Sequence, residues 1–212
     1  MKNLLITSVI ILTVLSGCKK DDINNQTDIT SQINNFPKEA LNADEIKSLT
    51  IMREEEKLAH DVYIALYNKW NVPVFTNIAS SEQTHTTAVL TLLNKYGLTD
   101  PAASNTVGVF NDTTLQNLYN QLVSQGSVST IDGFKVGATI EDLDIFDLNN
   151  WLTKVDNQDI QFVYQNLNKG SRNHMRSFYG QVVNAGGTYT AQFITQAELD
   201  AIINSTNETG SW

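Results

Sequence analysis

Cysteine and positive charge are scarce in this chain of 212 residues, which has one cysteine and 14 lysines and arginines. A single cysteine excludes an internal disulfide and any metal site built from several thiolates. With 23 aspartates and glutamates, the formal net charge is −9. This balance argues against nucleic acid as a partner, because nucleic-acid-binding proteins carry a basic footprint. The apolar content of 41% is ordinary for a soluble protein, and the length suffices for one domain with a core.

The N-terminal residues have the features of a targeting segment. The apolar run Leu4–Leu15 follows Lys2 and is too short to span a membrane as a permanent helix. It ends in Leu-Ser-Gly-Cys at positions 15–18, which resembles a bacterial lipobox. We therefore expect residues 1–17 to be a signal peptide and Cys18 to carry lipid after cleavage. The alternative is that Cys18 is an unpaired thiol in a discarded leader.

A lipid on Cys18 would anchor the protein to a membrane of the bacterial cell envelope. The residues from Cys18 to Asp22 resemble the signal on surface-exposed lipoproteins of the outer membrane. Residues 18–41 are rich in Asn, Asp, Gln and Thr, which predicts a flexible tether. The main domain is expected over 42–187. Residues 188–212 are expected to form a tail with a short helix, which a capping box opens at Thr195.

Four long stretches repeat core-type residues at intervals of three and four, the spacing of one helix face. Two of them, at about 42–70 and 74–96, are joined by a turn short enough to make them antiparallel neighbours. The other two are expected at about 129–155 and 157–185. The connection 98–128 is long enough to cross the height of a bundle, and it carries a short amphipathic pattern. The sequence therefore predicts an all-α fold, a four-helix bundle with a long crossover connection carrying a short extra helix.

Each of these four faces also includes titratable side chains, which a core does not tolerate unless something satisfies them. They are Glu56; Glu82 and His85; Glu141 with Asp144 on its flank; and His174. Four ionised carboxylates without a cation would repel one another and lose hydration. Two divalent ions would balance their charge, and two neutral imidazoles would complete the ligand set. Because carboxylates with imidazoles suit iron or manganese better than structural zinc, we predict a site for two ions of iron, with manganese as the alternative.

Several other features follow from the same spacing. Four acidic residues fall off the core faces and are expected to meet solvent: Glu54, Glu55, Asp142 and Asp147. Gly170 interrupts the last helical pattern at a cost of about 1 kcal/mol relative to alanine, which close packing or a local kink would explain. Two simpler interpretations remain open. The polar core residues could pair among themselves or with water, or Glu82 and His85 could hold a single ion.

Three segments resemble the family called domain of unknown function 2202: Met52–Tyr63, Ser81–His85 and Gly170–His174. The resemblance covers about residues 45–183. The overall spacing also resembles the ferritin-like superfamily, in which one helix supplies Glu, the next supplies Glu-x-x-His, and a second pair repeats the scheme. The acids Glu141 and Asp144 resemble a pair on the third helix of rubrerythrins. The resemblance implies a ferritin-like bundle whose metal ligands are Glu56, Glu82, His85, Glu141, Asp144 and His174.

Two details of the resemblance concern the chemistry. Tyr63, seven residues after Glu56, resembles a tyrosine that lies near the metals in ferritins and rubrerythrins; the alternative is an ordinary core tyrosine. Ser171 stands where the superfamily has the glutamate of its second Glu-x-x-His motif. Asp144 would replace that missing carboxylate, or the second ion would be weakly held.

Three functions are compatible with these residues. The first is an oxidoreductase that reacts with peroxide or oxygen, with Tyr63 as a catalytic hydrogen-bond donor or electron relay. With one cysteine there is no four-cysteine iron centre, so electrons would come from another protein. The second is a non-catalytic protein that captures or hands over metal at the envelope. The third is a tethered interaction module without chemistry. Iron storage fits poorly with a lipid tether, and the oligomeric state stays open, with a homodimer among the alternatives.

Overall fold

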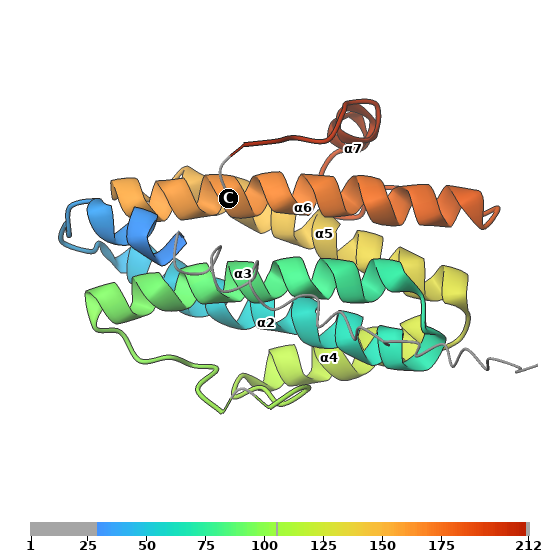
Figure 1. The fold of residues 1–212 in the computed structure, drawn as a ribbon, viewed down its shortest axis with the longest axis horizontal. Coiled ribbons are helices and arrows are strands. Elements are labelled where there is room, and N and C mark those ends of the chain that lie inside the picture. Colours follow the sequence, from blue (N-terminus) through green and yellow to red (C-terminus); the bar gives the residue numbers. More distant parts are fainter. Residues whose placement is uncertain (1–28, 105, 211–212) are drawn as a thin grey trace, which may run out of the picture.

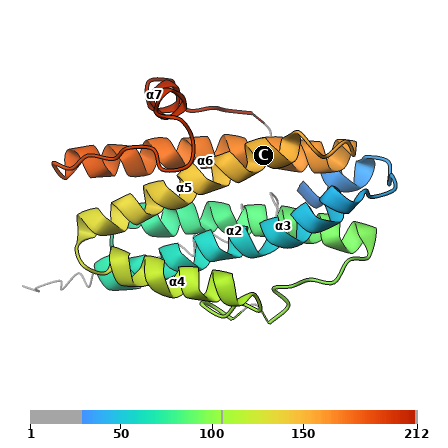
Figure 2. The same ribbon diagram turned by 180° about the vertical axis from the view of Figure 1, so that it is seen from behind.

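The computed structural model describes residues 29–104 and 106–210, and within these ranges it contains helices and loops but no strand. The helices α2 (Ala43–Trp70) and α3 (Pro73–Tyr96) pack against each other, as do α5 (Thr130–Leu152) and α6 (Gln158–Asn184). The two pairs lie side by side, with α3 next to α6 and α2 next to α5 (Figures 1 and 2). The predicted all-α class is confirmed, and the ends of the long helices lie within a few residues of those expected.

Local signals in the sequence explain where these helices begin and end. α2 starts with a capping box, in which Asn42 and Glu45 each accept a hydrogen bond from the other's backbone N–H. α3 has Pro73 at its first position and is capped at its C-terminus by Gly97, whose φ of 74° is in the left-handed region that favours glycine. The two-residue link between α2 and α3 makes them antiparallel.

The connection from α3 to α5 runs along the length of the molecule and includes α4 (Thr113–Gly126) (Figure 1). As a result, α3 and α5 run in the same direction. The loop before α4 is tied to α2 by Arg53, which donates to Asp100 at 3.0 Å, and by Lys57, which donates to the carbonyl of Thr106 at 2.8 Å. The short helix expected in this connection is confirmed.

The apolar core consists of two clusters with a polar layer between them. On α3, for example, Phe75 and Ile78 belong to one cluster, and Val89 and Leu92 belong to the other. The residues between these pairs include Glu82 and His85, and Glu56 on α2 and His174 on α6 likewise lie between the clusters. Glu141 on α5 is buried next to Ile140 and Ile145 of the first cluster. The fold therefore buries its titratable groups at one level, where they can meet.

Part of the expected flexible tether is helical in the structure. Residues 29–35 form a helical segment, and Ile29 and Ile33 are buried in the cluster that contains Leu92. The spacing of these two isoleucines by four residues explains why a segment with a polar composition packs here. Residues 1–28, with the predicted signal peptide and Cys18, lie outside the described part of the chain. Within that part, no helix is long and apolar enough to cross a membrane.

The expectation that Asp142 meets solvent is wrong, because Asp142 is fully buried under the C-terminal residues. Its carboxylate accepts hydrogen bonds from the hydroxyl of Tyr189 at 2.7 Å and from the backbone N–H groups of Gln192 at 2.6 Å and Ile194 at 2.8 Å. The helix α7 (Gln196–Ile203) follows with the predicted capping box and packs on α6. The residues after α6 are therefore docked on the helices.

Replacing Asp142 by alanine is expected to release this docked segment. The variant leaves buried N–H donors without an acceptor, each at a cost of about 1–3 kcal/mol. We expect a lower urea midpoint and faster proteolysis between α6 and α7, with the four long helices intact by circular dichroism. Asp147→Ala on the same helix is the control, because Asp147 is only half-buried. Equal protease resistance of the two variants would contradict this account.

Candidate metal centre

Five of the six predicted ligands come together in two groups, each of which can hold a metal ion. One group consists of Glu56, Glu82 and His85, and the other of Glu82, Glu141 and His174. In each group, one ligand atom per residue lies within 4.8 Å of the others, and all of these residues are buried. Glu82 belongs to both groups, so the two positions lie on either side of one carboxylate.

Both imidazoles present Nδ1 to Glu82. The Nδ1 of His85 lies 2.8 Å from Oε2 of Glu82 and 3.1 Å from Oε2 of Glu56. The Nδ1 of His174 lies 2.7 Å from Oε1 of Glu82 and 3.4 Å from Oε2 of Glu141. The two rings are stacked with centroids 5.5 Å apart. Each oxygen of Glu82 is thus matched with a different histidine.

Many of these ligand atoms make no hydrogen bond, although they are buried. The Nδ1 of His174 and the Oε1 of Glu82 are only 2.7 Å apart, yet neither has a partner in hydrogen-bond geometry. The same holds for one oxygen each of Glu56, Glu141 and Asp144. Buried polar groups are satisfied in native proteins with few exceptions. Here several buried nitrogen and oxygen atoms without a hydrogen bond lie together, and a bound cation would satisfy them.

Burial and mutual repulsion shift the pKa values of these groups. Burial raises the pKa of Glu56 to about 7 and the pKa of Asp144 well above its usual range, where the neighbouring Glu56 adds to the effect. Burial opposes ionisation of Glu82, but His174 and His85 lower its pKa below the usual range. Burial likewise opposes protonation of His174, yet Glu82 and Glu141 raise its pKa to about 9. Without a metal, the cluster therefore holds protons on its histidines and on some of its acids.

These shifts predict how the stability of the metal-free protein depends on pH. A folded pKa of about 7 for Glu56, against 4.5 in an exposed glutamate, means that the folded state keeps a proton that the unfolded chain releases. The contribution of Glu56 to the free energy of unfolding is therefore complete below pH 4.5 and is lost as the pH rises to about 7. His174 acts in the same direction, since its contribution is complete below pH 6.5 and is lost as pH rises through about 9.

We therefore expect the melting temperature of the metal-free protein to fall between pH 6 and pH 9, by about 2–4 °C for each kcal/mol lost. Added divalent metal should raise it more at pH 9 than at pH 6, because the ligands must lose their protons to bind. The pH dependence that Glu82 contributes is reversed, because its pKa in the folded state is lower than that of an exposed glutamate. Its contribution to stability is lost as the pH falls below 4.5. Differential scanning calorimetry of metal-free and metal-loaded samples measures this. A melting temperature that rises toward pH 9 without metal would contradict it.

Tyr63 is fully buried and donates a hydrogen bond to Oε1 of Glu141 at 2.5 Å. Burial, and then the charge of Glu141, raises the pKa of this tyrosine well above its usual value, so its hydroxyl stays a donor. The ring also packs against Phe178, with centroids 5.0 Å apart. Tyr63 contacts a ligand of the candidate site and not the shared carboxylate.

Asp144 is buried near the cluster but joins neither group of ligands in the described part of the chain. Ser171, at the position of the missing glutamate, is buried and donates to the carbonyl of Leu167 at 3.1 Å. Its hydroxyl is thus used within α6. Asp144 stays a predicted ligand, since one of its buried oxygens makes no hydrogen bond.

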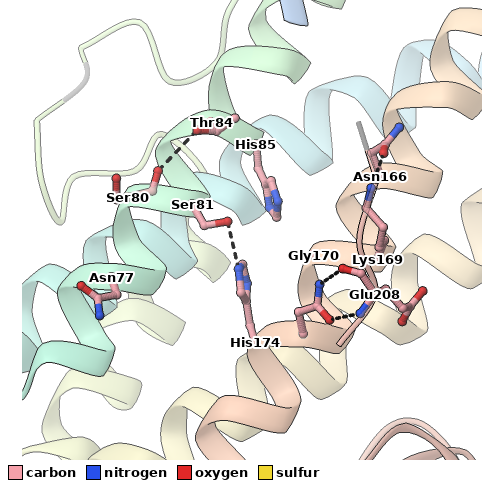
Figure 3. Close-up of a pocket in the computed structure, with 12 residues that line it drawn as sticks. Asn77, Ser80, Ser81, Thr84, His85, Asn166, Lys169, Gly170, His174 and Glu208 are labelled. Atoms are coloured by element: carbon pink, nitrogen blue, oxygen red, sulfur yellow. Dashed lines mark hydrogen bonds between the residues drawn. The ribbon is translucent and has the colours of Figure 1, made fainter. Parts of the chain in front are cut away.

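Two residues, Gly170 and Ser81, lie against the histidines of the site. A side chain at Gly170 would place its Cβ 2.5 Å from Nε2 of His85, so close packing explains the glycine in mid-helix. Ser81 shares a hydrogen bond of 2.9 Å with Nε2 of His174, and no signal in the sequence marked it (Figure 3). Outside the site, Glu54 is buried, contrary to expectation, and burial raises the pKa of Glu55 to about 8. The helical spacing predicts that both residues lie off the core face.

Comparison with known proteins shows the family. Residues 45–206 match the model of the uncharacterized protein domain DUF2202. The uncharacterized protein MJ0754 of Methanocaldococcus jannaschii is 52% identical over 178 residues, which cover 84% of this chain and 96% of that protein. The crystal structure of the hypothetical protein MJ0754 from Methanococcus jannaschii superposes with a TM-score of 0.80 at 53% identity, covering 81% of this chain and 98% of that one. This chain belongs to the DUF2202 family.

Proposed function

We propose that this chain is a ferritin-like protein that holds two divalent metal ions, iron or manganese, among its four long helices. The observation that carries the proposal is that Glu82 is shared by two groups of buried ligands. Glu56 and His85 would hold one ion, Glu141 and His174 would hold the other, and Glu82 would lie between them. Each such ion would supply one electron, so the pair would supply the two electrons that reduce peroxide, and we propose an oxidoreductase.

The side chains around the ligands support this role. Glu56, Glu82 and Glu141 are at most 1% exposed, so bulk water is kept from the ligand atoms. Ser81 engages Nε2 of His174, which leaves Nδ1 to face the carboxylates, and such partners orient metal-binding histidines. Tyr63 donates a hydrogen bond to one oxygen of Glu141. The other oxygen makes no hydrogen bond and would bind the metal ion.

A second candidate function is metal capture and delivery without catalysis. It is favoured by Ser171, because α6 offers only His174 where the superfamily pattern has a carboxylate as well. One ion would then be held by fewer protein ligands and would exchange more readily. An interaction module that lost its chemistry is the remaining alternative, and it predicts that added iron leaves the melting temperature unchanged.

The experiment that separates these functions starts from natively purified protein. Elemental analysis should find close to two equivalents of iron or manganese. The protein is then loaded with ferrous iron without oxygen and mixed with peroxide, and we expect oxidation that is faster than that of free ferrous iron, with turnover when a reductant is present. Tight binding without such acceleration would favour capture and delivery, and absence of metal would favour the interaction module.

Replacing Tyr63 by phenylalanine tests the role of its hydroxyl. The ring packing is kept while the hydrogen bond to Glu141 is lost. We expect two bound ions, with an affinity weakened by about tenfold, as is typical for a lost partner of a ligand. A catalytic role predicts that the rate with peroxide falls as well. Tyr164→Phe is the control, since Tyr164 is equally buried and donates to Ser48 away from the cluster. Equal metal affinities for the two variants would contradict the assigned role.

The location of the protein follows from the predicted lipid on Cys18. We propose attachment to the bacterial envelope, at the outer membrane, with electrons supplied by another protein because the single cysteine cannot build a second iron centre. Globomycin, which blocks lipoprotein signal peptidase, should cause the uncleaved precursor to accumulate. A Cys18→Ser variant that stays with membranes and is processed normally would exclude this mode of anchoring.

A further inference from the structure

A small apolar pocket lies where the crossover helix α4 packs against α2 and α5 (Figure 2). Its volume is about 60 Å³. Protein interiors contain few voids larger than a water molecule, so an open space of this kind is an exception. Six aliphatic side chains form most of its wall: Leu58 of α2, Leu115, Leu118 and Leu122 of α4, and Ile140 and Leu143 of α5.

The pocket extends from the surface toward the candidate metal centre. Phe193, which is 42% exposed, lines the end that meets solvent. Its backbone N–H donates to Oδ1 of Asp142 at 3.3 Å, so the docked segment after α6 holds it there. Asp144, which is 4% exposed, lines the inner end, where the charges of Glu56 and Glu141 act on its carboxyl group. A molecule in the pocket would therefore lie beside the predicted metal ligands.

The polar groups of the wall do not make the pocket itself a cation site. Glu55 and Asp144 each have one buried oxygen without a hydrogen bond, but neither belongs to a group of three possible metal ligands in the described part of the chain. A cation would also exchange its water for leucine side chains, which cannot replace that hydration. The hydroxyl of Thr139 already donates to the carbonyl of Lys135 and accepts from Gln192. The lining therefore suits an uncharged, apolar molecule.

The volume of the pocket limits that molecule to a few atoms. A cavity of about 150 Å³ with a lining of this kind stays dry and takes up benzene or xenon. The pocket has less than half that volume. Gases of small apolar molecules fit this description, and dioxygen is the one that the proposed function uses.

We propose that this pocket binds dioxygen and is the route by which dioxygen reaches the metal centre. The proposal rests on the proposed function for the use of its ligand, and it deepens that function by assigning one oxidant to one face of the helices. Peroxide is polar and would lose its hydrogen bonds to water among the leucines, so it would not favour this route.

Binding is tested with dioxygen itself, on the full chain in its metal-free form. Dissolved dioxygen is paramagnetic and speeds the relaxation of nuclei that it approaches, which NMR spectra of the methyl groups record under oxygen pressure, with nitrogen at the same pressure as the reference. We expect faster relaxation at Leu58, Leu122 and Ile140 than at Leu92, which is fully buried outside the pocket. Equal enhancement at these four residues would overturn the proposal.

A pair of tryptophan variants sharpens the test. Leu118→Trp fills the pocket and should remove the extra relaxation at Leu58 and Ile140. Leu152→Trp, the control, adds the same side chain at another partly buried leucine, on α5 and outside the pocket. Equal relaxation in the two variants would overturn the proposal. Leu118→Ala enlarges the pocket and should increase the relaxation, so this variant carries the test if the tryptophan disturbs folding, which circular dichroism checks.

The route is tested on the same variants loaded with ferrous iron. We expect oxidation by dioxygen to be several-fold slower in Leu118→Trp than in Leu152→Trp, whereas the two rates with peroxide should be alike. Equal rates with dioxygen would overturn the route.

The metal-free measurement separates this proposal from the proposed function. A chain that shows the extra relaxation but takes up no metal would support the dioxygen pocket and reject the metal centre. A chain that binds two metal ions, with no more relaxation in the pocket than at Leu92, would do the reverse.

Discussion

Replacing Glu82 by glutamine should remove both metal ions at once. Glu82 is the one residue common to the two ligand groups, with Oε1 facing His174 and Oε2 facing His85. Glutamine keeps the size of the side chain but removes the negative charge and one acceptor oxygen. Since the loss of a ligand's hydrogen-bond partner alone weakens metal binding about 10–100-fold, the loss of a shared ligand should exceed that range for both ions. Elemental analysis and calorimetric titration with ferrous or manganous ions measure the result.

Single-group variants supply the matched comparison. Glu56→Gln and Glu141→Gln each disturb one group and leave the other intact, so each should retain about one ion with little change in affinity. In the metal-free Glu82→Gln protein the two histidines lose the main charge that raises their pKa, so they are expected to release their protons and the chain to fold, which circular dichroism checks. A Glu82→Gln protein that still binds two ions, or a Glu56→Gln protein that binds none, would show that the two groups are not arranged around Glu82.

Replacing Gly170 by alanine should remove one ion of the two. The added Cβ would lie 2.5 Å from Nε2 and 2.6 Å from Cε1 of His85, which is closer than atoms can pack. The ring of His85 must then move, and its Nδ1 must leave the oxygens of Glu82 and Glu56. The same Cβ lies at an ordinary 3.9 Å from Cε1 of His174, so the second group should persist. We expect the metal stoichiometry to fall from about two to about one.

The matched control adds the same methyl group to the same helix at Gly180, where nothing lies within 4 Å of the new Cβ. Both alanines should favour the helix by up to about 1 kcal/mol. Gly180→Ala should therefore be as stable as the natural chain or more stable, with two ions bound. If Gly170→Ala also binds two ions with unchanged affinity, the contact of His85 with α6 does not position the ligand.

Much of the helical framework follows from the sequence by itself. The spacing of Met52, Glu56, Ala59 and Tyr63 on one helix face predicted that these residues are buried together, and they are. Capping residues predicted the helix ends, because a cap acts within one turn of the chain. The same local reasoning placed Glu82 and His85 on an inward face, three residues apart.

Other features depended on contacts between residues far apart in the chain. Asp142 is buried because three groups between Tyr189 and Ile194 fold onto it, and nothing near Asp142 in the sequence indicates that. The ion pair between Glu208 and Arg172 likewise joins residues separated by 36 positions. The buried helical segment at 29–35 also packs through distant partners.

The sequence by itself determined the helical class, the helix faces and the identity of the inward-facing acids and histidines. The physical reason is that a helix repeats every 3.6 residues, so the face of each residue is a local property. The tertiary structure alone decided that Glu82 is common to both ligand groups and that the residues after α6 dock on the long helices. These depend on the rotation and offset of each helix against its neighbours, which the packing of the whole core sets.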